Sequence, residues 1–117
     1  ALRVARTPRD RIEAIIRASF APAQFRPEMV SAWLNFYVQA LKSDEARRLL
    51  HVYQRRIRSN LQYAFRQIAP GQARTLTRGL AAMIDGLYIR HGLGGANPTE
   101  ATATVLDYLD RLLTDET

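Results

Sequence analysis

The chain contains no cysteine and only one lysine among its 117 residues. The absence of cysteine excludes disulfide bonds, thiolate metal ligands and a cysteine nucleophile, and it fits a protein of the cytoplasm. No apolar run approaches the roughly 20 residues that span a bilayer, and no secretory signal peptide begins the sequence. We therefore expect one domain, residues 1–117, that works in the cytoplasm without contacting a membrane.

Catalytic motifs are also missing. The only histidines, His51 and His91, lie on different predicted helices, with no acid or nucleophile at a recognisable spacing. The chain has no HExxH motif, no phosphate-binding glycine loop and no EF-hand. The glycine-rich segment Gly92–Gly95 follows a helix rather than a strand, which is typical of a helix end or hinge. We predict no enzymatic activity, no cofactor and no metal.

The net charge of +6 is carried almost entirely by arginine. Such a bias occurs in nucleic-acid-binding proteins, but it also follows from a GC-rich genome, which favours arginine codons. The basic stretch from Arg47 to Arg66 is the strongest candidate for contact with nucleic acid. Its arginines are spread around the predicted helix instead of lining one edge, which favours a solvated face.

No segment alternates apolar and polar residues as a strand does. Caps and helix breakers instead divide the chain into helical segments at about residues 7–20, 27–42, 43–68, 75–91 and 99–113. Thr7–Pro8, Pro27, Ser43 and Thr99 mark starts, and Pro70–Gly71 ends the third segment. These signals predict an all-α fold, an antiparallel helical bundle of about five to six helices.

The segment Thr75–His91 is apolar on two faces, and its third face consists of very small side chains that include Gly79 and Gly86. A helix that is apolar all round is buried on several sides. Small residues let another backbone come close, although a mid-helix glycine costs about 1 kcal/mol relative to alanine. We therefore predict a homodimer through this segment and the apolar band of Ala101–Leu113. The predicted interface residues are Gly79, Leu80, Ile84, Leu87, Val105, Tyr108, Leu109 and Leu112.

Aromatic residues gather on the second segment, where Trp33, Phe36 and Tyr37 share one side. Further aromatic side chains are placed to approach from other helices: Tyr53, Tyr63 and Tyr88. Core packing explains any one of them, but a cluster of this kind also suits a quaternary ammonium ion, to which each cation–π contact contributes about 0.5–2 kcal/mol. Asp85 lies inside the two-faced helix, where it acts either as a counter-charge in a pocket or as a cap on a neighbouring helix.

Three segments resemble a known family: Asp10–Ile15 (DRIEAI), Ala32–Tyr37 (AWLNFY) and Leu80–Leu87 (LAAMIDGL). The chain resembles TetR-family repressors, and most closely the BetI type, which controls genes for the conversion of choline to glycine betaine. The resemblance covers essentially the whole chain. It implies the C-terminal regulatory domain of such a repressor, whose last two long helices form a four-helix bundle with those of a second subunit.

The resemblance also implies a pocket for a small-molecule inducer, with choline or a related quaternary ammonium ion as the expected ligand. The candidate ligand-binding residues are Trp33, Phe36, Tyr37, Tyr63, Met83, Asp85 and Tyr88. The family's N-terminal helix-turn-helix domain has no counterpart in these residues, so operator DNA is expected to be bound only through a domain absent from the chain. A TetR-type sensor of another small molecule and a ligand-free helical dimerisation module remain alternatives.

Overall fold

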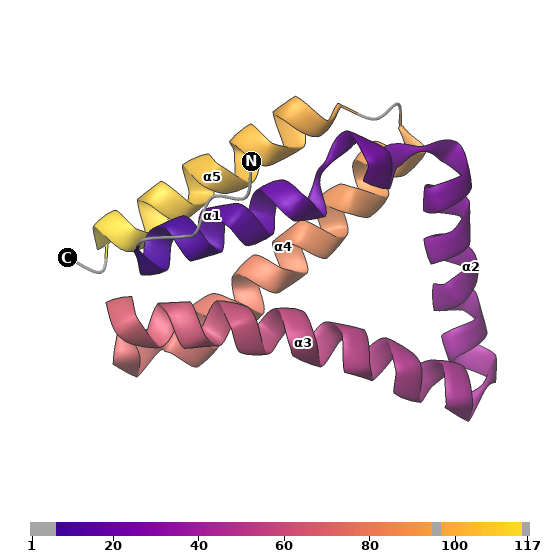
Figure 1. Cartoon of the computed structure of the whole chain (residues 1–117), viewed down its shortest axis with the longest axis horizontal. Helices are drawn as coiled ribbons and strands as arrows, with labels where there is room; N and C mark the ends of the chain where they lie inside the picture. The colour runs from indigo at the N-terminus through magenta and orange to yellow at the C-terminus, as the bar shows by residue number, and fades with distance from the viewer. Residues whose placement is uncertain (1–6, 95–96, 116–117) are drawn as a thin grey trace.

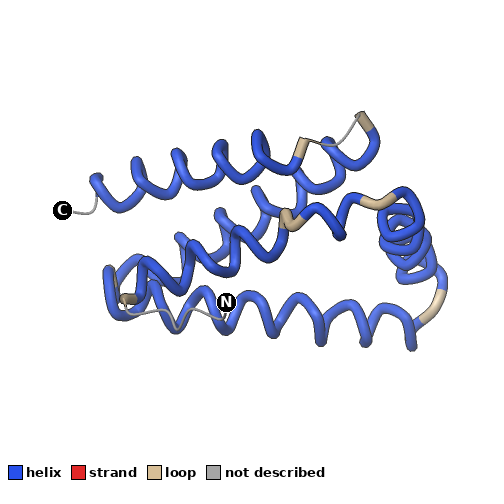
Figure 2. Tube along the Cα trace, turned by 45° about the horizontal axis from the view of Figure 1, so that its top comes forward, coloured by secondary structure: helices blue, strands red, loops and turns tan. Residues whose placement is uncertain are grey.

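The computed structural model describes residues 7–94 and 97–115, and every regular element in these two ranges is a helix (Figures 1 and 2). In chain order the elements are α1 (Pro8–Ser19), η1 (Pro22–Phe25), α2 (Pro27–Lys42), α3 (Asp44–Ile68), η2 (Pro70–Gln72), α4 (Ala73–Leu93) and α5 (Pro98–Asp115), where η denotes a short 3₁₀ helix. The predicted all-α class is therefore confirmed.

Local signals set the starts of the first three helices where the sequence predicts them. The side chain of Thr7 accepts a hydrogen bond from the backbone N–H of Asp10 at 3.0 Å, which caps α1. The Ser43 hydroxyl accepts one from the N–H of Ala46 at 3.2 Å, which caps α3. Pro27 occupies the first turn of α2, where its missing N–H costs nothing.

The start of α5 differs from the prediction. The side-chain oxygen of Asn97 accepts a hydrogen bond from the backbone N–H of Glu100 at 3.0 Å. Asn97 rather than Thr99 therefore caps this helix, with Pro98 at its first position. Asparagine before proline is itself a common way to begin a helix, so the sequence contained the signal.

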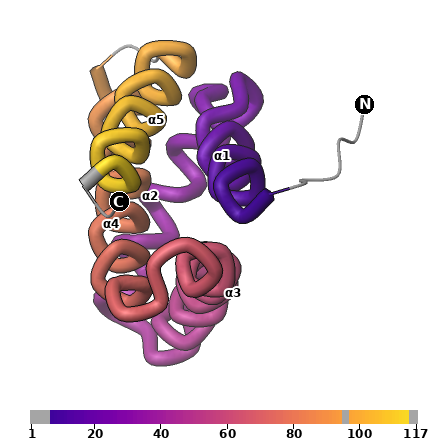
Figure 3. The backbone as a smooth tube through the Cα atoms, turned by 90° about the vertical axis from the view of Figure 1, so that its left-hand side faces the viewer, coloured from indigo at the N-terminus to yellow at the C-terminus, as the bar shows by residue number. Residues whose placement is uncertain are grey.

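The hydrophobic core lies where α1, α4, α5 and the C-terminal half of α3 meet. Figure 3 shows these four helices end on, with α1 beside α5. The largest fully buried side chains are Phe20, Phe65, Ile12, Ile16, Leu61, Leu80, Leu109 and Val105. Truncating one such aliphatic side chain to alanine typically costs about 2–5 kcal/mol, so this end of the molecule supplies most of the stability.

The other end of the molecule is more open. There, α2 stands across the bundle and joins the N-terminus of α3 (Figure 1). Residues 44–60 of α3 include no buried residue, and α2 buries only Val30 and Ala40. A Cβ atom added at Gly92 would lie 3.0 Å from Val30 Cγ1, so glycine at this position lets the end of α4 come close to α2. The divergence of α2 and α3 from the core leaves room for a cavity.

Candidate functional site

A cavity of about 560 Å³ lies between α2, α3 and α4, with residues of α1 and η1 on one side. This volume falls in the range of roughly 300–1,000 Å³ that is usual for small-molecule sites. Four aromatic side chains line it: Trp33, Tyr37, Tyr53 and Tyr88. Its other lining residues include Asp85 and three arginines, so the cavity combines aromatic surface with separate charges of both signs.

Trp33 is the centre of the aromatic cluster. Its ring centroid lies 5.4 Å from that of Tyr53 with the planes at 80°, and 6.0 Å from that of Tyr37. These are the edge-to-face and tilted geometries that aromatic pairs prefer. Phe36 also touches Trp33, at 5.8 Å between centroids. The Trp33–Tyr53 pair joins α2 to α3 and thereby holds the two aromatic walls of the cavity together.

Tyr88 belongs to the α4 wall and is fixed at its hydroxyl. Its Oη atom donates a hydrogen bond of 2.6 Å to the backbone carbonyl of Gln24 in η1. Its ring packs against Phe25, with centroids 5.1 Å apart. The ring is buried with the hydroxyl already satisfied, so Tyr88 offers the cavity ring surface rather than a free hydrogen-bonding group.

Asp85 lies three residues before Tyr88, on the same side of α4. The structure shows no hydrogen bond or ion pair for its carboxylate among the described residues, which excludes the helix-cap interpretation for this part of the chain. The Asp85 side chain is exposed toward the cavity, but the protein around it displaces part of its water, and this partial desolvation raises the pKa of Asp85. Burial, and then the negative charge of Asp85, also raise the pKa of Tyr37.

The positive charges of the cavity are separated from Asp85. Arg78 precedes Asp85 by seven residues on α4, which corresponds to about 10 Å along the helix axis. Arg56 and Arg58 come from α3, one turn beyond Tyr53. The end of the cavity near Asp85 is therefore aromatic and acidic, and the basic groups lie further along.

The structure brings together four of the seven candidate ligand-binding residues: Trp33, Tyr37, Asp85 and Tyr88 all line the cavity. The other three are not among its described lining residues. Phe36 packs behind Trp33, and Met83 packs against the core. Tyr63 is 54% exposed, with the guanidinium carbon of Arg11 5.2 Å from its ring centroid.

Sequence reasoning omits Tyr53 from the candidate ligand-binding residues, although it lines the cavity. Its position three residues after Leu50 and four before Ile57 is the available signal, since both of these residues also line the cavity. Ser19 and Gln24 are cavity residues as well, contributed by α1 and η1. No sequence pattern predicts that these two residues line the cavity.

The predicted interface residues divide into two groups. Four of them are buried within the core of a single chain: Leu80, Ile84, Val105 and Leu109. Their apolar surface is used by α1, α3 and each other, and it is not free for a partner. The remaining four are exposed or half-buried: Gly79, Leu87, Tyr108 and Leu112. An interface on α4 and α5 would therefore use the second group and its exposed neighbours.

Comparison with known proteins agrees with this architecture. The family described as "BetI-type transcriptional repressor, C-terminal" matches residues 8–114. The chain belongs to this family. Within the described ranges, no helix is both long and apolar enough to span a bilayer. No solved structure is significantly similar to the chain.

Two relatives illustrate the similarity. The "HTH-type transcriptional regulator BetI" of Brucella canis is 48% identical over 112 residues, which are 93% of this chain and 57% of that protein. The protein of the same name from Rhizobium meliloti is 51% identical over 106 residues, 90% of this chain and 52% of the relative. The chain thus spans about half the length of these relatives. They are transcriptional regulators and not enzymes, in agreement with the sequence-based prediction.

Proposed function

We propose that the chain is the regulatory domain of a BetI-like repressor and that its larger cavity binds choline or a related quaternary ammonium ion. One observation carries this proposal. The Asp85 carboxylate, without a partner in the described part of the chain, faces a cavity whose walls include Trp33, Tyr37, Tyr53 and Tyr88. A cation in the cavity would meet an unpaired opposite charge that is already partly desolvated.

The chemistry of the cavity fits a quaternary ammonium ion in particular. Such an ion has no N–H donor, so it is recognised by charge and by the negative faces of aromatic rings rather than by hydrogen bonds. The aromatic walls supply those faces, and Asp85 supplies the opposite charge. Each cation–π contact contributes about 0.5–2 kcal/mol, so two or three rings account for a weak to moderate affinity.

We further propose that a second copy of the chain packs against the exposed face of α4. A Cβ atom added at Gly79 or Gly86 would meet nothing within 4 Å, so both glycines face open space in one chain. Leu93 is 68% exposed and Tyr108, on α5, is 40% exposed. A partner helix would cover these apolar side chains and could approach α4 closely along its glycines.

The cavity and the proposed interface share α4. Asp85 faces the cavity, and its neighbour Gly86 faces open space on the helix surface. A ligand beside Asp85 is therefore positioned to shift the helix on which the two subunits meet. Such a ligand regulates DNA binding only if its affinity differs between two arrangements of the dimer. We propose that operator DNA is contacted by a helix-turn-helix domain outside these 117 residues.

Replacement of Trp33 by leucine tests the ligand. We expect the choline Kd to rise by about tenfold, because leucine retains apolar volume but has no π face. The readout is the thermal shift of the chain across a choline titration. Ligand at a hundredfold excess over Kd stabilises the fold by about 2.7 kcal/mol, which is readily visible.

Tyr63→Leu is the matched control, because this aromatic residue is exposed and lies outside the lining of the cavity. Its choline response should equal that of the unmodified chain. An unchanged response in Trp33→Leu, or an equal loss in both variants, would remove the aromatic cluster from the ligand site. If betaine aldehyde and glycine betaine stabilise the chain as much as choline does, the aromatic cavity remains the ligand site, but its ligands include a wider class of quaternary ammonium compounds.

A further inference from the structure

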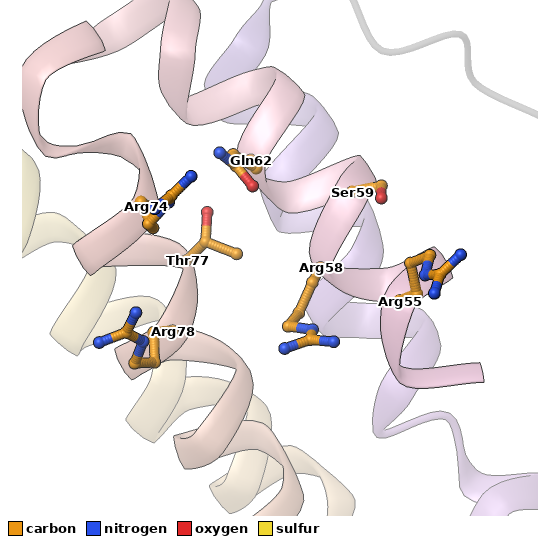
Figure 4. Close-up of a pocket in the computed structure, with 7 residues that line it drawn as sticks. All are labelled: Arg55, Arg58, Ser59, Gln62, Arg74, Thr77 and Arg78. Atoms are coloured by element: carbon orange, nitrogen blue, oxygen red, sulfur yellow. The ribbon is translucent and has the colours of Figure 1, made fainter. Parts of the chain in front are cut away.

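A second, smaller cavity lies between α3 and α4 (Figure 4). Its volume is about 330 Å³. Four of its lining residues are arginines: Arg55, Arg58, Arg74 and Arg78. The others are uncharged polar residues, and no carboxylate is among the described residues that line it. Its wall therefore carries four positive charges from two helices, which is a different chemistry from that of the aromatic cavity.

None of these four arginines is neutralised by an acidic side chain in the part of the chain that the structure describes. The ion pairs found there use other arginines: Arg9, Arg17, Arg47 and Arg111. Each guanidinium group carries five N–H donors and no acceptor, so only an anion or a neutral acceptor can satisfy it. Like charges gathered at one cavity also repel each other, which an anion would relieve.

Thr77 gives an independent indication of a ligand. Its side chain is only 3% exposed, and its hydroxyl has no hydrogen-bond partner among the described residues. Buried polar groups nearly always have a partner, and leaving one unpaired costs about 1–3 kcal/mol. Figure 4 shows the hydroxyl pointing into the space between α3 and α4, near the side chains of Arg74 and Gln62. Thr77 therefore indicates an acceptor that the chain itself does not supply.

The start of α4 adds to the positive potential. This helix begins at Ala73 without a side-chain cap and with no acidic residue in its first turn, where Arg74 stands. The positive end of the helix dipole is thus not offset by a nearby carboxylate. Thr77 lies one turn further along the same helix. The helix dipole, the Arg74 side chain and the Thr77 hydroxyl therefore all favour negative charge near the start of α4.

We propose that this cavity binds a small phosphate-type oxyanion, with the guanidinium groups of Arg58 and Arg74 and the hydroxyl of Thr77 as donors. The planar guanidinium fork matches the oxygens of phosphate and forms charge-assisted hydrogen bonds with them. The cavity has the volume of roughly ten water molecules, which accommodates an ion as large as pyrophosphate.

The arrangement favours a small anion over a nucleic-acid backbone. In Figure 4, Arg58 and Arg74 point into the space between their two helices, whereas Arg55 and Arg78 point away from it. The Thr77 hydroxyl, deeply buried between the helices, points toward Arg74 and Gln62, and the Arg58 guanidinium lies further along the same space (Figure 4). Duplex DNA presents one charge per roughly 1.7 Å along its axis and is instead met by an outward-facing row of basic side chains.

Isothermal titration calorimetry of the 117-residue chain with pyrophosphate and with inorganic phosphate, at constant ionic strength, tests this site. We expect one ion bound per chain. Arg74→Gln and Thr77→Val should each raise the Kd by about tenfold, since each removes one hydrogen bond to a charged group. Thr77→Val should leave the Tm of the ligand-free chain equal or higher, because it removes an unpaired buried hydroxyl.

The matched controls are Arg90→Gln and Thr75→Val, two substitutions at exposed positions of the same helix. Neither should change the Kd of pyrophosphate. Absence of binding by the unmodified chain would overturn the site, as would equal losses in Arg74→Gln and Arg90→Gln. Tighter binding of an arbitrary DNA duplex than of pyrophosphate would assign the arginines to nucleic acid instead. If Arg74→Gln converts a dimer to monomers, the arginines belong to the subunit interface and not to an anion site.

Discussion

Replacement of Asp85 by asparagine is expected to stabilise the ligand-free chain at neutral pH and to remove most of its affinity for choline. The two effects have one cause. Burial raises the pKa of Asp85, so the protein around the cavity disfavours the charged carboxylate as long as no cation is present. Asparagine has nearly the same shape without the charge. The Tm should therefore rise while the choline-induced shift disappears.

The pH dependence follows from the same shift. The folded chain holds the Asp85 proton to a higher pH than the unfolded chain, in which aspartate titrates near about pH 4. The free energy of unfolding therefore falls as the pH rises from this value through the raised pKa of Asp85, and Asp85→Asn removes that fall. Choline favours the charged carboxylate, so its affinity should increase over the same pH window.

Asp107→Asn is the control, because Asp107 is an exposed aspartate within α5 that pairs with Arg111 on the surface. Exposed pairs of this kind contribute at most about 1 kcal/mol, so this variant should keep its choline response and gain no stability. Thermal unfolding with and without choline from about pH 4 to pH 7 provides the measurement. A choline response retained in Asp85→Asn would show that Asp85 is not the counter-charge.

Gly86→Glu is expected to convert the proposed dimer to monomers without unfolding the chain. A Cβ atom at position 86 meets nothing within 4 Å in one chain, so the substitution leaves the core intact. It also replaces a mid-helix glycine, which favours the helix by up to about 1 kcal/mol. In a dimer that meets along α4, however, the new carboxylate would be pressed against its own copy and lose its water.

Sedimentation velocity, together with circular dichroism, separates assembly from folding. Gly71→Glu is the matched control, since Gly71 also faces open space but lies in η2. We expect dimers for the unmodified chain and for Gly71→Glu, and folded monomers for Gly86→Glu. A Gly86→Glu variant that remains dimeric would place the interface elsewhere. Monomers in the unmodified chain would contradict the proposed dimer itself.

The sequence predicts local features of the fold better than it predicts partners in packing. Thr7 and Ser43 accept hydrogen bonds from backbone N–H groups three residues away, and Pro27 acts through its own fixed backbone angle, so the starts of α1, α2 and α3 follow from short segments. Segment 75–91 is apolar on two faces and carries small residues on a third, and nothing in the sequence tells which of these faces the chain covers by itself. The structure shows that Leu80 and Ile84 lie in the core, while the glycine face remains open.

The same limit applies to the cavity. Tyr53 and Tyr63 are ten residues apart on one helix and therefore point about 80° away from each other around its axis. Tyr53 lies where α3 has left the core, and it lines the cavity, whereas Tyr63 lies beside Arg11 on the outside of α1 and α3. Which tyrosine faces the cavity depends on the path of the helix through the fold, and spacing alone does not determine that path.

We propose that the larger cavity recognises a positive charge through Asp85 and the rings around it. Calorimetric titration of the chain with choline, and with 3,3-dimethyl-1-butanol as its uncharged isostere, tests whether the cavity selects for charge. The two ligands have the same shape, so only charge distinguishes them. Choline should bind and the alcohol should bind at least about tenfold more weakly, given cation–π and carboxylate contacts of about 1.4 kcal/mol or more in total. Equal binding of both ligands, or no binding of choline, would show that this cavity does not recognise a quaternary ammonium ion by its charge.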